Sequence, residues 1–166
     1  MAIRVGCAVM YKRGLGIGNL PAGLALGRLA GPGPQNETGA AMSDVAALVR
    51  RYVERYNSND VDGMLECCAD DVVFETVTNP GGSIRLNGKE EMREVIEATT
   101  RAFRERRHDV IAMIVEGERA AAETVFSGVA AAELGQSVRP GEHVSIRGAT
   151  IFETRDNRLA RICDYS

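Results

Sequence analysis

The stretch YVERYNSNDVDGMLECCADDVVFE, residues 52–75, predicts two helices followed by a strand. Its first residues continue a helix, and Asn57–Asp60 interrupts the pattern with residues that favour turns. Asp60 can cap a second, short helix that residues 69–71 end. Val72–Val77 is rich in β-branched residues and predicts a strand.

Upstream of this stretch the apolar residues recur at the spacing of one helix face. Ser43 is a residue type that caps helices, so we expect the first helix to begin there. The predicted buried stripe of that helix consists of Val45, Leu48, Val49, Tyr52, Val53 and Tyr56.

Downstream, a third helix is predicted over Lys89–Arg106, after which the pattern alternates as strands do. We interpret the basic run at its end, 101–107, as a solvated face near the negative end of the helix dipole. The predicted strands are His108–Val115, Ala120–Ala132, His143–Thr154 and Leu159–Ser166. Early helices followed by hairpins indicate an α+β fold, a curved sheet with helices packed on one face.

Composition limits the function classes. The chain has 166 residues, 45% of them hydrophobic, which suits a domain with its own core. A formal net charge of −3 argues against a general nucleic-acid binder, and no long uncharged apolar run predicts a membrane span. The four cysteines have no metal-binding spacing, so we interpret them as reduced thiols in a cytoplasmic protein. No motif for a metal or an organic cofactor is present, and we predict none.

Residues 1–42 differ from the rest, because they hold half of the 18 glycines and three of the five prolines. We predict a flexible extension here and a single domain over 43–166. Met42 immediately precedes the ordered pattern, so a start assigned too far upstream is a second explanation of the extension.

The final strand, LARICDYS (159–166), places a carboxylate among apolar neighbours. Alternation puts Asp164 on the same face as Ile162. If that face is buried, the charge must be paired or its pKa must rise, as it does in general acids and bases that work near neutral pH. If the face is solvated, Asp164 is an ordinary surface residue.

Three segments together resemble the nuclear transport factor 2-like superfamily: residues 52–75, NGKEEMREVI (87–96) and ATIFETRDNRLARICDYS (149–166). Within it they are similar to SnoaL-like polyketide cyclases, ketosteroid isomerases and limonene-epoxide hydrolases. The resemblance implies a cone, in which a strongly curved, mixed or antiparallel sheet wraps around three N-terminal helices and encloses a pocket. It also implies a homodimer through the outer sheet face, where His143 and Arg147 would lie.

The resemblance also indicates which side chains face the pocket. Tyr52 falls where the isomerases place an oxyanion tyrosine, and Tyr56 would lie at the pocket rim. The isomerase base position holds Thr76, and the hydrolase Arg and Asp positions hold Thr124 and Phe126. The other predicted inward residues are Phe74, Val144, Ile146 and Ile162. We expect His108, at a strand start, to be exposed or to interact with the end of the third helix.

Three functions follow from this interpretation. The first is a cofactor-independent cyclase or isomerase of a hydrophobic, oxygenated metabolite (a polyketide, terpenoid or steroid), with Asp164 as general acid/base and Tyr52 or a threonine hydroxyl on the substrate oxygen. The second is a non-catalytic ligand-binding or dimerisation module of the same fold. The third is an epoxide hydrolase with an altered polar set. None of the three requires nucleic acid or a membrane.

Overall fold

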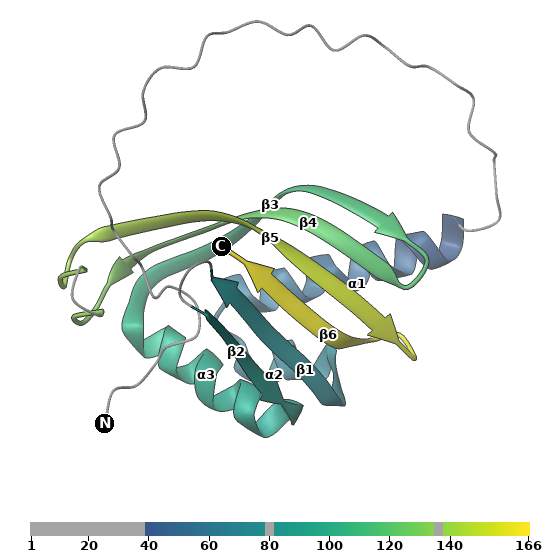
Figure 1. Ribbon diagram of the computed structural model, residues 1–166, viewed down its shortest axis with the longest axis horizontal. Helices are drawn as coiled ribbons and strands as arrows, with labels where there is room; N and C mark the ends of the chain where they lie inside the picture. Colours follow the sequence, from purple (N-terminus) through teal and green to yellow (C-terminus); the bar gives the residue numbers. More distant parts are fainter. Residues whose placement is uncertain (1–38, 79–81, 135–137) are drawn as a thin grey trace, which may run out of the picture.

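The computed structural model describes residues 39–78, 82–134 and 138–166 (Figure 1). These residues form an α+β fold, as predicted. The elements in chain order are α1 (Gly39–Asn57), α2 (Val61–Glu66), β1 (Cys68–Thr78), β2 (Gly82–Asn87), α3 (Gly88–Ala102), β3 (Phe103–Glu116), β4 (Arg119–Ala130), β5 (His143–Arg155) and β6 (Arg158–Tyr165). The predicted extension lies outside the described residues, except for the first turn of α1.

The strands form one mixed sheet in the order β2-β1-β6-β5-β4-β3. Neighbours are antiparallel except β1 and β6, which run parallel and bring together two strands distant in the sequence. The long strands β3, β4 and β5 arch over the molecule, so the sheet is strongly curved (Figure 1). The register pairs Thr76 of β1 and Thr150 of β5 with Asp164 on the strand between them.

The helices fill the inside of this curve, and α1 runs under β3 while α3 packs along β1 and β2. The predicted α1 stripe is buried throughout, from Val45 to Tyr56. Leu48 is only 1% exposed, and burying such a side chain contributes about 1.5–3 kcal/mol relative to leaving it in water. No helix among the described residues is long and apolar enough to cross a membrane.

Three predicted element boundaries are wrong. The first helix begins at Gly39, so Ser43 lies inside it and does not cap it. β1 begins at Cys68, four residues before the predicted start. The third helix ends at Ala102, because Phe103 is already extended (φ −129°, ψ 138°) and pairs with Ala130 of β4. The helix-forming residues after it therefore lie in a strand, where sheet pairing outweighs local propensity.

The turns follow the predicted chemistry. Asp60 caps α2 by accepting a hydrogen bond from the Gly63 backbone N–H at 2.9 Å. Asn59, in the break between α1 and α2, has a φ of 58°, in the left-handed region that asparagine tolerates better than most residues. Asp156 and Asn157 have φ values of 51° and 57°, which suits a tight hairpin turn.

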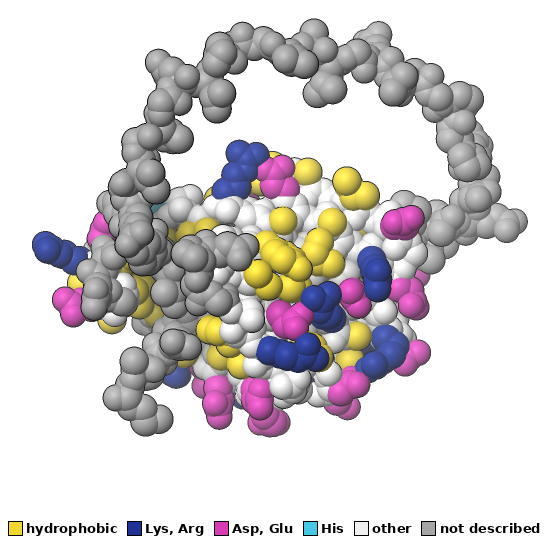
Figure 2. All heavy atoms as spheres, viewed as in Figure 1, with side chains coloured by type: hydrophobic (Ala, Val, Ile, Leu, Met, Phe, Trp, Pro, Cys, Tyr) yellow, Lys and Arg dark blue, Asp and Glu magenta, His cyan; other side chains and the backbone are white. Residues whose placement is uncertain are grey.

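The outer face of the sheet carries an ion-pair ladder, which we define as Arg85, Glu75, Arg161, Glu153 and Arg119 on five successive strands. Its contacts shorten toward Glu75, whose oxygens lie 2.8 Å from Arg85 Nη1 and 2.7 Å from Arg161 Nη2. Figure 2 shows dark blue and magenta side chains side by side on this face. The alternation along these strands therefore places the ladder on the outer face, next to the apolar side chains that Figure 2 also shows there, and the pocket-lining side chains on the inner face.

Candidate functional site

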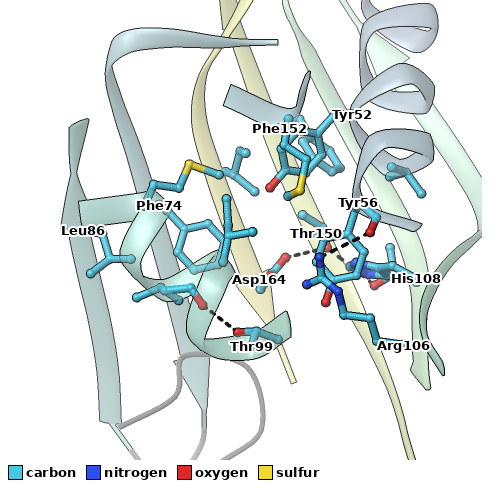
Figure 3. Close-up of a pocket in the computed structure, with 17 residues that line it drawn as sticks. Tyr52, Tyr56, Phe74, Leu86, Thr99, Arg106, His108, Thr150, Phe152 and Asp164 are labelled. Atoms are coloured by element: carbon cyan, nitrogen blue, oxygen red, sulfur yellow. Dashed lines mark hydrogen bonds between the residues drawn. The ribbon is translucent and has the colours of Figure 1, made fainter. Parts of the chain in front are cut away.

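A pocket lies between the helices and the inner face of the sheet (Figure 3). About 590 Å³ of space lies between its lining side chains when the solvent at its mouth is counted, and the cavity volume itself is about 40 Å³. Apolar side chains of α1, α3 and the strands form most of its wall. The polar lining includes Arg106, His108, Thr150 and Asp164, which gather on one side in Figure 3, with Phe74 opposite. An apolar pocket with a few convergent polar groups is the usual form of a small-molecule site.

Asp164 lies at the centre of the polar side. The Thr150 hydroxyl donates a hydrogen bond to Asp164 Oδ1 at 2.7 Å, and Thr150 is only 2% exposed. Thr124 Oγ1 lies 3.5 Å from Thr150 Oγ1. Because the Thr150 proton points to the carboxylate, Thr124 must be the donor in that contact. Two adjacent strands thus supply a short hydroxyl chain that orients the carboxylate.

A second, shallower pocket adjoins the first, and both are lined by His108, Thr124, Thr150 and Asp164. Gly148 also lines this second pocket, at a point where β6 passes close to its backbone. A β-carbon at position 148 would lie 2.3 Å from the Tyr165 carbonyl oxygen, so only glycine fits without a shift. The four shared residues therefore separate an inner chamber from an outer one.

Most of the predicted site residues meet at these pockets. Besides Asp164, those that line the inner pocket are Tyr52, Tyr56, Phe74, Thr124 and Ile162. Phe126 and Ile146 line the outer pocket. Thr76 and Val144 are buried, at 8% and 1% exposure, but line neither pocket. Tyr52 packs edge-on against Phe152, with ring centroids 6.3 Å apart.

The prediction that His108 is exposed or interacts with the helix end is wrong. Its ring lines both pockets and packs edge-on against Tyr56 at 5.5 Å. Asn57 fixes the local backbone, because its side chain donates to the His108 carbonyl at 3.0 Å and accepts from its N–H at 2.7 Å. Burial lowers the pKa of His108 below 6.5, although the charge of Asp164 acts in the opposite direction. The imidazole is therefore neutral at pH 7 and can accept a proton.

The interpretation of 101–107 as a solvated helix face is wrong for Arg106, which is only 5% exposed and lines the inner pocket. The sequence signal for both missed residues was weak. His108 and Phe103 both face inward although they are five positions apart, an odd spacing that simple alternation forbids.

The described part of the chain offers few other candidates for a metal-binding or nucleophilic group. Its His, Cys, Asp and Glu side chains form no cluster of three that could hold a metal ion. Burial raises the pKa of the Cys68 thiol to about 12, so this cysteine is protonated at neutral pH and a poor nucleophile. The Asp164 side of the pocket is therefore the strongest candidate site among the described residues.

Solved structures share this fold. A candidate polyketide cyclase from Xanthomonas campestris pv. campestris is 24% identical, and the match covers 76% of this chain and 92% of that one with a TM-score of 0.63. An LEH-like epoxide hydrolase of M. tuberculosis is 17% identical over 75% of this chain and 83% of its own, with a TM-score of 0.60. A Catenulispora acidiphila protein with a ketosteroid isomerase-like fold, in complex with trimethylamine, is 16% identical over 72% and 84%, with a TM-score of 0.59.

These likenesses establish the fold and not the reaction, because one such scaffold hosts several chemistries. No curated protein matches the chain in sequence. The SnoaL-like domain, however, matches residues 49–162, from the middle of α1 to β6. The chain therefore belongs to the SnoaL-like domain family, within the nuclear transport factor 2-like superfamily.

Proposed function

We propose that this protein is a cofactor-independent cyclase or isomerase in which Asp164 moves a proton on a carbon next to a carbonyl group. The observation that carries the proposal is the placement of Asp164 between two adjoining pockets, with one oxygen held by Thr150. The largely apolar wall suits a hydrophobic, oxygenated small molecule such as a polyketide, terpenoid or steroid. The candidate polyketide cyclases among the structural neighbours agree with this class.

The residues around Asp164 support proton transfer in different ways. The Thr124–Thr150 hydroxyl chain restricts rotation of the carboxylate, which helps to hold it in one orientation in the pocket wall. The neutral imidazole of His108 gives the proton a second acceptor in the same chamber. A positioned acid/base group of this kind typically contributes about 10²–10⁴-fold to a rate.

Two alternatives compete with this function. An epoxide hydrolase of the related type needs an arginine and a second carboxylate at positions where β4 has Thr124 and Phe126. Among the described residues that line either pocket, Asp164 is the one acidic residue, so the second carboxylate is missing. A binding module without catalysis would use the same pocket but would not need Asp164. The experiment below separates that alternative from the enzyme.

The test measures solvent deuterium exchange at the carbon beside a carbonyl, by NMR, with acetophenone and 1-indanone as probes. We expect the protein to accelerate exchange and Asp164→Asn to remove about 10²-fold or more of the acceleration. The matched control is Asp71→Asn, which removes an exposed carboxylate paired with Arg155. Equal exchange in the wild type and Asp164→Asn, with both probes bound, would favour the binding module.

The proposal includes a homodimer through the outer sheet face. Its support is apolar exposure on the edge strand β3, where Ile114 is 76% exposed between the half-buried Met113 and Val115. Burying such side chains against a second copy would remove apolar surface from water. Sedimentation velocity of the wild type and Ile114→Lys tests it, and a monomeric wild type at micromolar concentration would contradict it.

A further inference from the structure

Arg106 is a buried cation in the wall of the pocket. It is 5% exposed, and it lies on β3 two residues before His108. A guanidinium keeps its positive charge at every pH at which the protein is folded. Removing such a group from water is costly unless its donors and its charge find partners.

A bulge in β3 turns Arg106 toward the pocket. The register jumps from Arg104↔Val129 to Arg107↔Ser127, so two residues of β3 oppose the single Gly128 of β4. The first of the two, Glu105, has a φ of 53°, a left-handed conformation that is strained for a non-glycine residue. Without the extra residue, alternation from the inward Phe103 would direct Arg107 inward and Arg106 to solvent.

Gly128 makes room for this bulge. A β-carbon at position 128 would lie 3.4 Å from the Arg106 α-carbon and 3.3 Å from the Phe103 ring. The backbone of β3 can therefore approach β4 closely at the residue that faces the pocket.

The hydrogen-bond partners of the Arg106 guanidinium satisfy only some of its N–H groups. Nε donates to the side-chain oxygen of Asn59 at 2.7 Å, and Nη2 donates to the Tyr56 carbonyl at 3.4 Å. The group also stacks on the Tyr56 ring, 4.0 Å from its centroid. Both hydrogen-bond acceptors are uncharged. Among the described residues, Arg106 Nη1 is the one buried side-chain nitrogen or oxygen without a hydrogen-bond partner.

We propose that Arg106 Nη1 binds a negatively charged oxygen of the ligand, on a planar carbon that is either an enolate or a carboxylate. This assignment rests on the proposed function, because it places the charge that Asp164 would create within the same pocket. Arg106 would thus stabilise the substrate oxygen in place of the tyrosine or threonine hydroxyl that the sequence predicts. A hydrogen bond between two charged groups is roughly twice as strong as one between neutral groups. Arg106 would then be a catalytic residue.

The proposed step transfers one proton and moves two electron pairs. Asp164 takes a proton from the carbon beside the carbonyl, the C–H electron pair forms the C=C bond, and the carbonyl electron pair moves to oxygen. That oxygen accepts a hydrogen bond from Arg106 Nη1. Return of the proton from Asp164 to another carbon completes an isomerisation. In a cyclisation, the enolate carbon instead attacks a second carbonyl, whose oxygen takes the proton.

The test compares matched single-ring ligands by titration calorimetry at pH 8, where both anions are ionised. For a carboxylate the pair is benzoate and benzamide, and for an enolate it is 4-nitrophenolate and 4-nitroanisole. We expect at least one anion to bind the wild type tenfold more tightly than its neutral partner. Arg106→Gln should abolish the preference, Arg106→Lys should keep part of it, and Arg104→Gln, which alters an exposed arginine of the same strand, should leave it unchanged.

A second measurement needs no variant that could fail to fold. NMR of the guanidinium N–H signals in the wild type should show the Arg106 signals shift with the anion and not with its neutral partner. A wild type without anion preference, no anion binding at millimolar concentration, or a preference that survives Arg106→Gln would overturn the assignment.

These results can be told apart from failure of the proposed function. Asp164→Asn should still bind the anion, and more tightly, because a negative charge has left the pocket. Proton exchange that depends on Asp164 without any anion binding would leave the function standing and remove the Arg106 subsite. Anion binding that depends on Arg106, without proton exchange, would leave the Arg106 subsite standing and remove the proposed function.

Discussion

Glu75→Gln should destabilise the protein because Glu75 is the centre of the outer ion-pair ladder. Its side chain is 18% exposed and contacts Arg85 on one side and Arg161 on the other. The Arg85 side chain is 59% exposed, so that pair contributes at most a few tenths of a kcal/mol. Arg161 is 33% exposed and binds through two nitrogens, so its contribution is about 1 kcal/mol. The expected loss in free energy of unfolding is about 1–2 kcal/mol at pH 7.

The contribution of Glu75 to the free energy of unfolding depends on pH. The hydrogen bond from Arg161, aided by the charges of Arg161 and Arg85, holds the pKa of Glu75 below 4.5 in the folded protein. The unfolded chain therefore takes up the proton first, and the stabilisation is complete above about pH 4.5 and disappears as the pH falls through the folded-state pKa. The difference in stability between the wild type and Glu75→Gln should be largest at pH 7 and should shrink as the pH falls below 4.5.

Urea unfolding at pH 7, 5 and 3, followed by circular dichroism, measures the difference in free energy of unfolding between the wild type and Glu75→Gln. The control is Asp70→Asn, because Asp70 is 97% exposed and pairs with Lys89 alone. We expect no measurable change in the urea midpoint for this control at 0.15 M salt. A stability difference for Glu75→Gln that does not shrink between pH 5 and pH 3, or one no larger than that of the control at pH 7, would refute the reasoning.

Three further predictions concern the site. Thr150→Val removes the donor to Asp164 and the acceptor for Thr124, and should lower the deuterium-exchange rate about 10–100-fold and the free energy of unfolding by about 1–3 kcal/mol. Gly148→Ala places a β-carbon against the Tyr165 carbonyl and should lower the free energy of unfolding by about 1–3 kcal/mol, measured by urea titration. The pKa of His108, from NMR titration, should lie below 6.5 and should fall further in Asp164→Asn, because the Asp164 charge raises it; an upward shift would contradict this.

The sequence predicted the parts of the fold that depend on strict periodicity. The α1 stripe follows the helical repeat, and every member from Val45 to Tyr56 is buried. Alternation placed Asp164 on the same face as Ile162, and both side chains line the pocket; that this face is the inward one came from the family resemblance and not from the strand alone. The stripe and the alternation need only local geometry, so one sequence is enough to find them.

The missed features depend on partners distant in the sequence. Residues 103–107 contain strong helix formers, and only pairing with β4 makes them a strand. The bulge at Glu105 then shifts the alternation by one residue, which moved Arg106 and His108 from the predicted surface to the pocket. A bulge of this kind leaves no consistent mark in the sequence, because its position is set by the strand opposite.

The parallel pairing of β1 with β6 has a consequence for how the protein is made. The two strands lie about 80 residues apart along the chain, and β6 fills the gap between β1 and β5. Since ribosomes add roughly 5–20 residues per second, the edge of β1 waits some 4–16 s for its partner during synthesis. Such long-range pairing slows folding and leaves an open strand edge available to other chains. Asp164 arrives with that same strand, so a nascent chain would gain its candidate acid/base group only when the sheet closes.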